Sequence, residues 1–224
     1  MVIESPAPAA AGQVALEGGG DGLDSKAAFD QEEMSVLVWL VSKGMANALS
    51  GLSQMLRHAI QVTSLDLKRL ETRTAADALE PPGIPGVGIH LKIDGDAAGH
   101  MLLVYEPSIA YRLIDLQLGQ PDGSTQRLDE MGSSVLGEMG NVAGTHFLNA
   151  LADTTNLLLM PSPPVVTVDA ARSILNVPLE TLAETQEDTF VMKATFGDDS
   201  GDFGGRLVIL PTTRFVRAVV KRPI

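Results

Sequence analysis

The sequence predicts an α+β fold in which two similar halves, related by a pseudo-two-fold axis, build one largely antiparallel sheet flanked by two long helices. The first observation is an internal duplication. Asn47-Ala48-Leu49 recurs as Asn149-Ala150-Leu151 late in a helical stretch, and a β-rich region follows each copy. Helix, strand, hairpin and short helix thus occur twice, about 100 residues apart, a period too long for a solenoid repeat.

The first half supplies the second observation, a change from helical to strand periodicity. Residues 30–59 carry apolar side chains at helical spacing, with few breakers. Residues 62–70 alternate as a strand does, and Asp94-Gly95 marks a hairpin turn. The elements expected here are a helix at 30–59, strands at 62–70, 87–93 and 99–105, and a short helix at 108–118.

The second half repeats this order. Its long helix carries three glycines, and its final helix is basic. The elements expected here are a helix at 128–155, strands at 163–169, 189–196 and 203–210, and a helix from Thr213. The repeat halves therefore cover about 30–120 and 126–224, and we expect residues 29–224 to form a single domain.

Residues 1–28 differ in composition from the remainder. Pro6, Pro8, an alanine cluster and Gly18-Gly19-Gly20 are typical of a flexible tail. An unstructured leader is the simpler interpretation, and a docking peptide is the alternative.

Composition excludes several classes of function. The net charge of −12 argues against nucleic acid and anionic membranes as partners, because both bind basic surfaces. No apolar run approaches the length that spans a bilayer, and the amino terminus lacks the pattern of a secretory signal, so no membrane insertion is expected. The absence of cysteine fits a reducing, cytoplasmic location.

One polar constellation has both a regular geometry and a chemical use. Ser134, Glu138 and Asn141 are spaced i, i+4 and i+7, which places them on one stripe of the helix at 128–155. Gly137, Gly140 and Gly144 form an adjacent stripe. Three helical glycines cost about 3 kcal/mol relative to alanine, so we expect something to approach this stripe closely. A simply solvated acid and amide, or a tight helix contact in the core, are the alternatives.

The spacing Ser134-x3-Glu138-x2-Asn141, followed by Pro164, resembles the signature of the CheC/CheX/FliY family of chemotaxis response-regulator phosphatases. The run 128–167 is similar to the second half of a CheC protein, and 34–118 is more loosely similar to its first half. The resemblance implies hydrolysis of the aspartyl phosphate on a phosphorylated CheY-type response regulator. That regulator would supply the magnesium ion, so no metal or cofactor of this chain's own is expected.

The same resemblance assigns roles to individual residues. Asn141 would orient the attacking water, and Glu138 would bridge to a lysine of the regulator. Ser134 would orient Glu138, and Pro164 would shape the entry of the following strand. Gly137 and Gly140 would let the helix slide close to the regulator's loops.

The first helix lacks an acid–amide pair. The matching positions are Val36 and Trp39 in one register, or Trp39 and Ser42 in the other. One active site is therefore expected, with a first helix that is structural or recruits a partner. The rival interpretation is a non-enzymatic binding or scaffold module of the FliM type, with a CheD-type deamidase as one partner that the resemblance allows.

Other chemistries find no support. His58, His90, His100 and His146 lack metal-type spacing, so structural roles are expected. The acidic segment 197–202 lacks the ligand ladder of a calcium loop and is expected to be a hairpin loop. The sequence contains neither a phosphate-binding loop ending in Gly-Lys-Ser/Thr nor a Gly-x-Ser-x-Gly elbow.

Overall fold

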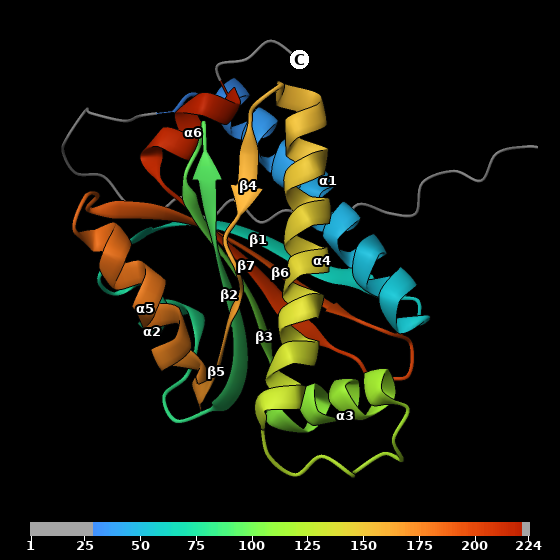
Figure 1. Ribbon diagram of the computed structural model, residues 1–224. Coiled ribbons are helices and arrows are strands. Elements are labelled where there is room, and N and C mark those ends of the chain that lie inside the picture. The colour runs from blue at the N-terminus through green and yellow to red at the C-terminus, as the bar shows by residue number, and fades with distance from the viewer. Residues whose placement is uncertain (1–28, 221–224) are drawn as a thin grey trace, which may run out of the picture.

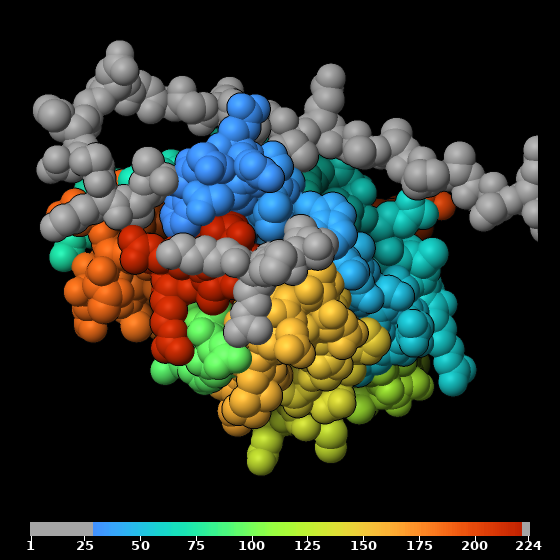
Figure 2. Space-filling model, turned by 90° about the horizontal axis from the view of Figure 1, so that it is seen from above, coloured from blue at the N-terminus to red at the C-terminus, as the bar shows by residue number. Residues whose placement is uncertain are grey.

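A computed structural model describes residues 29–220, in which a central seven-stranded sheet has helices on both faces (Figure 1). The two long helices lie side by side on one face, and the view from above shows the C-terminal helix beside the first helix (Figure 2). The helices are α1 (Gln31–Leu56), α2 (Ala75–Leu79), α3 (Pro107–Leu118), α4 (Glu130–Thr155), α5 (Ala171–Ala183) and α6 (Thr213–Val220).

The boundaries of the long helices follow from local capping. The Asp30 carboxylate accepts from the Glu33 amide, and the Glu33 carboxylate accepts from the Asp30 amide, which completes a capping box before α1. The Asp129 side chain caps α4 by accepting from the Gly132 amide. Arg57 and Asn156 end the two helices in the left-handed conformation.

All strand pairs of the sheet are antiparallel, as predicted. The order is β1-β6-β7-β3-β2, and β4 and β5 both pair with the outer side of β2. The strands are β1 (Gln61–Glu71), β2 (Pro85–Gly95), β3 (Gly99–Tyr105), β4 (Leu159–Pro161), β5 (Val165–Ala170), β6 (Asp188–Gly197) and β7 (Gly205–Pro211).

The order of elements is helix, strand, helix, hairpin, helix in both halves of the chain. The first half runs α1, β1, α2, β2, β3, α3, and the second runs α4, β5, α5, β6, β7, α6, with β4 inserted after α4. Each half lends its first strand to the other: β1 pairs with β6, and β5 pairs with β2. The hairpins meet at β3 and β7, where the pseudo-two-fold axis lies.

Two helices are missing from the sequence prediction. Helices α2 and α5 were not predicted, although they cover the second face of the sheet. The predicted hairpin turn at Asp94-Gly95 lies within the connection between Ile93 and Gly99, which are directly paired, so this part of the prediction is confirmed. Asp94 and Gly95 also pair with β4.

The sheet separates two apolar cores. The larger core lies between the sheet and helices α1, α3, α4 and α6, and β2 contributes Val87, Ile89, Leu91 and Ile93 to it. The smaller core lies under α2 and α5. Residues of β2 therefore alternate strictly between the α4 face and the α5 face.

Helix α1 packs tightly against α4. A Cβ atom on Gly44 would lie 2.5 Å from Leu151 Cδ1, and one on Gly51 would lie 2.8 Å from the His146 ring. Among the described helices, α1 alone is long and apolar enough to cross a bilayer, and half of that stretch is buried within the protein, as in an ordinary core helix. The predicted tail, residues 1–28, lies outside the described residues, and the cytoplasmic location stays a prediction.

Candidate active site on helix α4

The predicted stripe lies on the outer surface of α4. Glu130–Thr155 is one uninterrupted helix, so Ser134, Glu138 and Asn141 project from it on neighbouring turns. Ser134 and Glu138 are exposed, and Asn141 is half-buried. The opposite side of the helix enters the larger core through Leu136, Met139, Ala143 and Phe147.

The acid and the amide are in contact. The Asn141 Nδ2 donates to Glu138 Oε2 over 3.4 Å, which is long for a hydrogen bond of this type. The carboxylate is thus held only loosely and can turn to a partner. The Asn141 amide keeps its carbonyl oxygen as an acceptor and a second N–H as a donor, the combination that a positioned water needs.

The glycine stripe does not face a docking partner, which corrects the expectation that Gly137 and Gly140 lie open for a regulator. Gly137, Gly140 and Gly144 are all buried. A Cβ on Gly140 would lie 2.6 Å from Ile89 Cγ2 and 3.3 Å from Pro164 Cβ. The stripe lets β2 and the β4–β5 connection approach α4. This is the alternative of a tight contact in the core, except that strands and not a second helix approach the glycines.

Pro164 lies beside the site as a consequence of this packing. A Cβ on Gly137 would meet Pro164 Cγ at 3.5 Å, and Gly137 directly precedes Glu138. The segment that leads into β5 thereby forms a wall along one side of the polar stripe. The proline contributes shape and no titratable group.

Positive charge is missing from this helix. Its 26 residues include Glu130, Glu138 and Asp153 but neither lysine nor arginine. Within the described residues, no group of three or more histidine, aspartate or glutamate side chains could hold a metal ion. The helix therefore offers an acid and an amide, and the counter-charge for a phosphoryl group must come from elsewhere.

The corresponding surface of α1 has different chemistry. Aligning the first and last residues of the two 26-residue helices places Trp39 opposite Glu138 and Ser42 opposite Asn141, which is the second of the two predicted registers. Trp39 is 46% exposed, and Lys43 Nζ lies 5.5 Å from the centre of its ring. The Ser42 hydroxyl donates to the Val38 carbonyl, so it is occupied within the helix.

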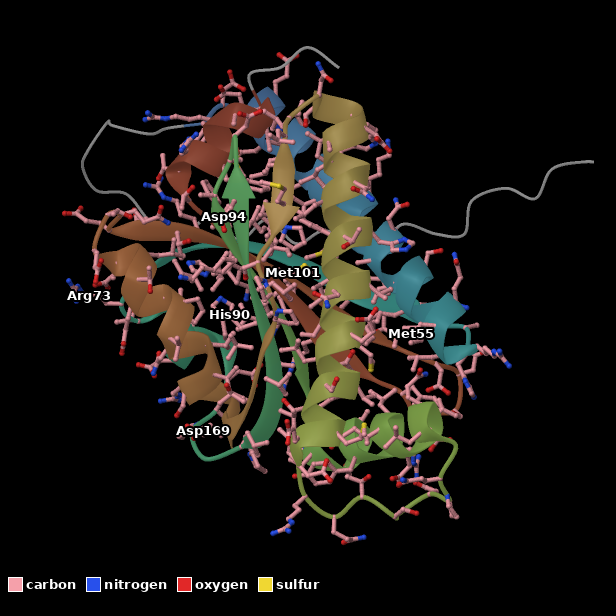
Figure 3. The ribbon with its side chains drawn as sticks, in the orientation of Figure 1. Met55, Arg73, His90, Asp94, Met101 and Asp169 are labelled. Atoms are coloured by element: carbon pink, nitrogen blue, oxygen red, sulfur yellow. The ribbon has the colours of Figure 1, made fainter. Side chains whose placement is uncertain are left out.

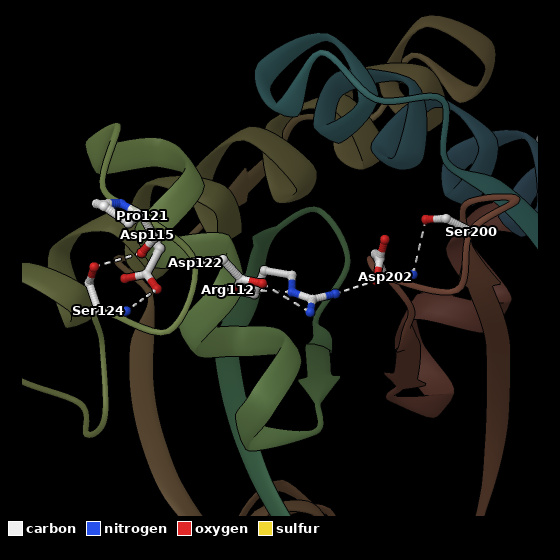
Figure 4. Close-up of polar contacts among 7 residues, drawn as sticks. All are labelled: Arg112, Asp115, Pro121, Asp122, Ser124, Ser200 and Asp202. Atoms are coloured by element: carbon white, nitrogen blue, oxygen red, sulfur yellow. Dashed lines mark hydrogen bonds and ion pairs between the residues drawn. The ribbon is translucent and has the colours of Figure 1, made fainter.

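A polar hollow of about 740 Å³ lies apart from this stripe, and it is lined by α3 and the loops at 122–126 and 201–202. Its central cation, Arg112, pairs with Asp122 and Asp202 (Figure 4). The buried Asp115 carboxylate accepts from Ser124 and Thr125, which lowers its pKa. These contacts tie the connection between the halves to the β6–β7 loop, and the acid–amide pair takes no part in them.

Two of the histidines form a pair that their spacing in the sequence did not reveal. His90 Nε2 and His100 Nδ1 are 2.9 Å apart on the sheet face that α5 covers, opposite α4 (Figure 3). Burial lowers the pKa of His100 to about 4, with smaller effects from His90 and Lys92. Burial and Lys92 lower the pKa of His90 as well. Pairing across β2 and β3 could be found only once their register was known.

A search among known proteins finds a relative in sequence. The CheY-P phosphatase CheC of Bacillus subtilis (strain 168) is 30% identical over 172 residues, which cover 76% of this chain and 82% of that protein. No protein-family model matches the chain.

Solved structures share the fold. FliY of Thermotoga maritima has a TM-score of 0.67 at 18% identity, covering 86% of this chain and 96% of FliY. FliM in the FliG–FliM complex of H. pylori has a TM-score of 0.59 at 11% identity, covering 87% and 100%. The CheX–CheY–BeF3–Mg²⁺ complex of Borrelia burgdorferi matches with a TM-score of 0.50 at 16% identity, covering 77% and 97%. Sequence and fold together place the chain in the CheC/CheX/FliY family of chemotaxis proteins.

Proposed function

We propose that this protein is a phosphatase that hydrolyses the aspartyl phosphate of a CheY-type response regulator. The observation that carries the proposal is the contact between Glu138 and Asn141 on the outer face of α4. The family relationship to a CheY-P phosphatase supports it, and so does the complex of the structurally similar CheX with CheY.

Asn141 orients the attacking water. Its amide accepts one hydrogen bond and donates another, which holds a water in line with the phosphorus. The new bond joins the water oxygen to phosphorus, the bond from phosphorus to the aspartyl oxygen breaks, and aspartate and inorganic phosphate leave. An acyl phosphate is already activated, so positioning the water supplies most of the acceleration.

Glu138 fixes the position of the regulator. Its exposed carboxylate pairs with a lysine of the receiver domain, and Ser134, one turn away, orients it. Because α4 has no lysine or arginine, the charge of the phosphoryl group is balanced by the receiver's own lysine and by the magnesium ion bound in its acidic pocket. This division of labour makes the phosphorylated receiver, and no small phosphate ester, the substrate.

A scaffold function is the rival. The structural likeness to FliM and the loss of the acid–amide pair on α1 favour it. In that case the chain would bind a receiver, or a CheD-type deamidase, without turnover. The pair on α4 distinguishes the two functions, because a scaffold does not need it.

The test compares the loss of phosphate from a phosphorylated receiver in Mg²⁺ with wild-type protein and with Asn141→Ala. We expect acceleration by the wild type, and a loss of at least about 100-fold in Asn141→Ala because a positioning group is removed. Asn149→Ala removes the same amide from an exposed position two turns further along α4 and should retain the wild-type rate. Acceleration by Asn141→Ala equal to the wild type would refute the proposal.

A further inference from the structure

Two large apolar side chains near the N-terminal end of the polar stripe are exposed to solvent. Met131 is 59% exposed, and Val168 on β5 is 46% exposed. Met131 precedes Glu138 by seven residues, which is close to two helical turns, so its side chain lies on the same stripe as Ser134, Glu138 and Asn141. The stripe is therefore polar at its centre and apolar at its N-terminal end.

Val168 lies on the same side of the sheet as α4. It is directly paired with Val87, which is fully buried in the larger core beneath α4. Opposite residues of an antiparallel pair point to the same face, so Val168 also points to the α4 face. The segment before it, at Pro164, already contacts the glycine stripe of α4. Val168 thus continues the wall that Pro164 begins.

The charges of the site contribute little to the affinity for the receiver, so apolar contacts have to contribute the larger part. Glu138 is the only charged side chain on this stripe, and one exposed ion pair adds little affinity. Both proteins are also acidic where they meet, since the receiver's phosphorylation pocket is itself acidic. Affinity for the receiver must therefore come mainly from buried apolar area.

We infer that Met131 and Val168 form an apolar docking surface for the receiver domain, both toward the N-terminal end of α4 from the catalytic pair. This inference rests on the proposed function, because it takes the receiver as the occupant. The receiver surface around its phosphorylation site would present apolar side chains to both residues, while its lysine meets Glu138. Met131 and Val168 would then contribute to binding and leave the chemical step unchanged.

The chain offers a matched control for each residue. Val165 lies on the same strand as Val168 and is 59% exposed, but its partner His90 points to the α5 face. Met160 on β4 is 53% exposed, and its partner Asp94 is on that face too, since it alternates with the buried Ile93. Changes at Val165 and Met160 therefore introduce the same charge at similar exposure on the wrong side of the sheet.

The experiment measures turnover and binding separately. Met131→Glu and Val168→Asp should each raise KM for the phosphorylated receiver about tenfold and leave kcat within about twofold. Met160→Glu and Val165→Asp should leave both constants within about twofold. Binding of the receiver, kept phosphorylated by excess phosphodonor, is then measured in the Asn141→Ala background, where Met131→Glu and Val168→Asp should weaken it by the same factor.

The outcomes separate this inference from the proposed function. Wild-type KM and binding in both Met131→Glu and Val168→Asp would overturn the inference while leaving the phosphatase intact, and so would equal losses in the two control variants. If the wild type gives no acceleration but binds the receiver, and Met131→Glu weakens that binding, the phosphatase fails and the docking surface stands. Failure of the Asn141→Ala protein to bind the receiver would overturn the docking surface.

Discussion

Replacing Gly140 by alanine should destabilise the protein, whereas the same change at Gly137, three residues earlier, should stabilise it. At Gly140 the new methyl group would lie 2.6 Å from Ile89 Cγ2, a branch held rigidly against the backbone of β2. Such overpacking costs about 1–3 kcal/mol, and the gain in helix propensity returns only about 1 kcal/mol. We expect Gly140→Ala to lower the free energy of unfolding by up to about 2 kcal/mol.

At Gly137 the new methyl would meet only Pro164 Cγ at 3.5 Å, an ordinary contact. The helix propensity gain of about 1 kcal/mol therefore remains. The two variants should differ by about 1–3 kcal/mol, which corresponds to about 2–12 °C in Tm for a domain of this size. Urea and thermal unfolding, followed by circular dichroism, measure this difference.

A Gly140→Ala protein as stable as Gly137→Ala would refute the packing described for α4 and β2. Activity adds a second check. Because Gly137 faces Pro164 and no partner, Gly137→Ala should dephosphorylate the receiver within about twofold of the wild-type rate. A large loss of activity with an intact fold would show instead that the glycine stripe contacts the receiver.

Three further predictions concern the rest of the molecule. His100 has a pKa of about 4 and is only 6% exposed, so the folded state binds fewer protons than the unfolded state. After allowance for solvent screening, the neutral His100 contributes about 2 kcal/mol to the free energy of unfolding; this is complete above pH 6.5 and is lost as the pH falls to about 4. His100→Gln should therefore reduce the pH dependence of the free energy of unfolding in urea across this window. An unchanged pH dependence would contradict this. Glu80, 3% exposed, accepts from Arg206 over 2.8 Å, so Glu80→Ala should cost about 2–4 kcal/mol in urea unfolding, and a loss below 1 kcal/mol would show that the pair is dispensable. Trp39→Ala should leave receiver dephosphorylation within about twofold of wild type, because α1 has no acid–amide pair; a tenfold loss would place Trp39 in the site.

The sequence specified those parts of the fold that depend on local signals. Apolar side chains at helical spacing predict the long helices, and alternating residues mark the strands. Helix α5 was not predicted, because Pro178 interrupts its helical sequence pattern and because it follows β5 without a side-chain cap. The five-residue α2 is too short to show a helical period at all.

The candidate site could be placed in sequence because Glu138 and Asn141 belong to one continuous helix, where spacing determines geometry. The element that the glycine stripe faces could not be predicted from the sequence, because spacing within a helix does not say which face another element covers. That required the position of β5, which pairs with β2 from the other half of the repeat. The position of Val168 depends on the same long-range pairing.

The central claim is that one acid–amide pair, on α4, performs the hydrolysis. The measurement that tests it most directly is the rate of phosphate release from a phosphorylated CheY-type receiver in Mg²⁺, with increasing amounts of the Asn141→Ala protein. Because α1 presents Trp39 and Ser42 where α4 presents the pair, we expect this rate to fall to that of the receiver alone. Retention of about half of the wild-type acceleration would reveal a second active surface, and full retention would contradict the assignment of Asn141.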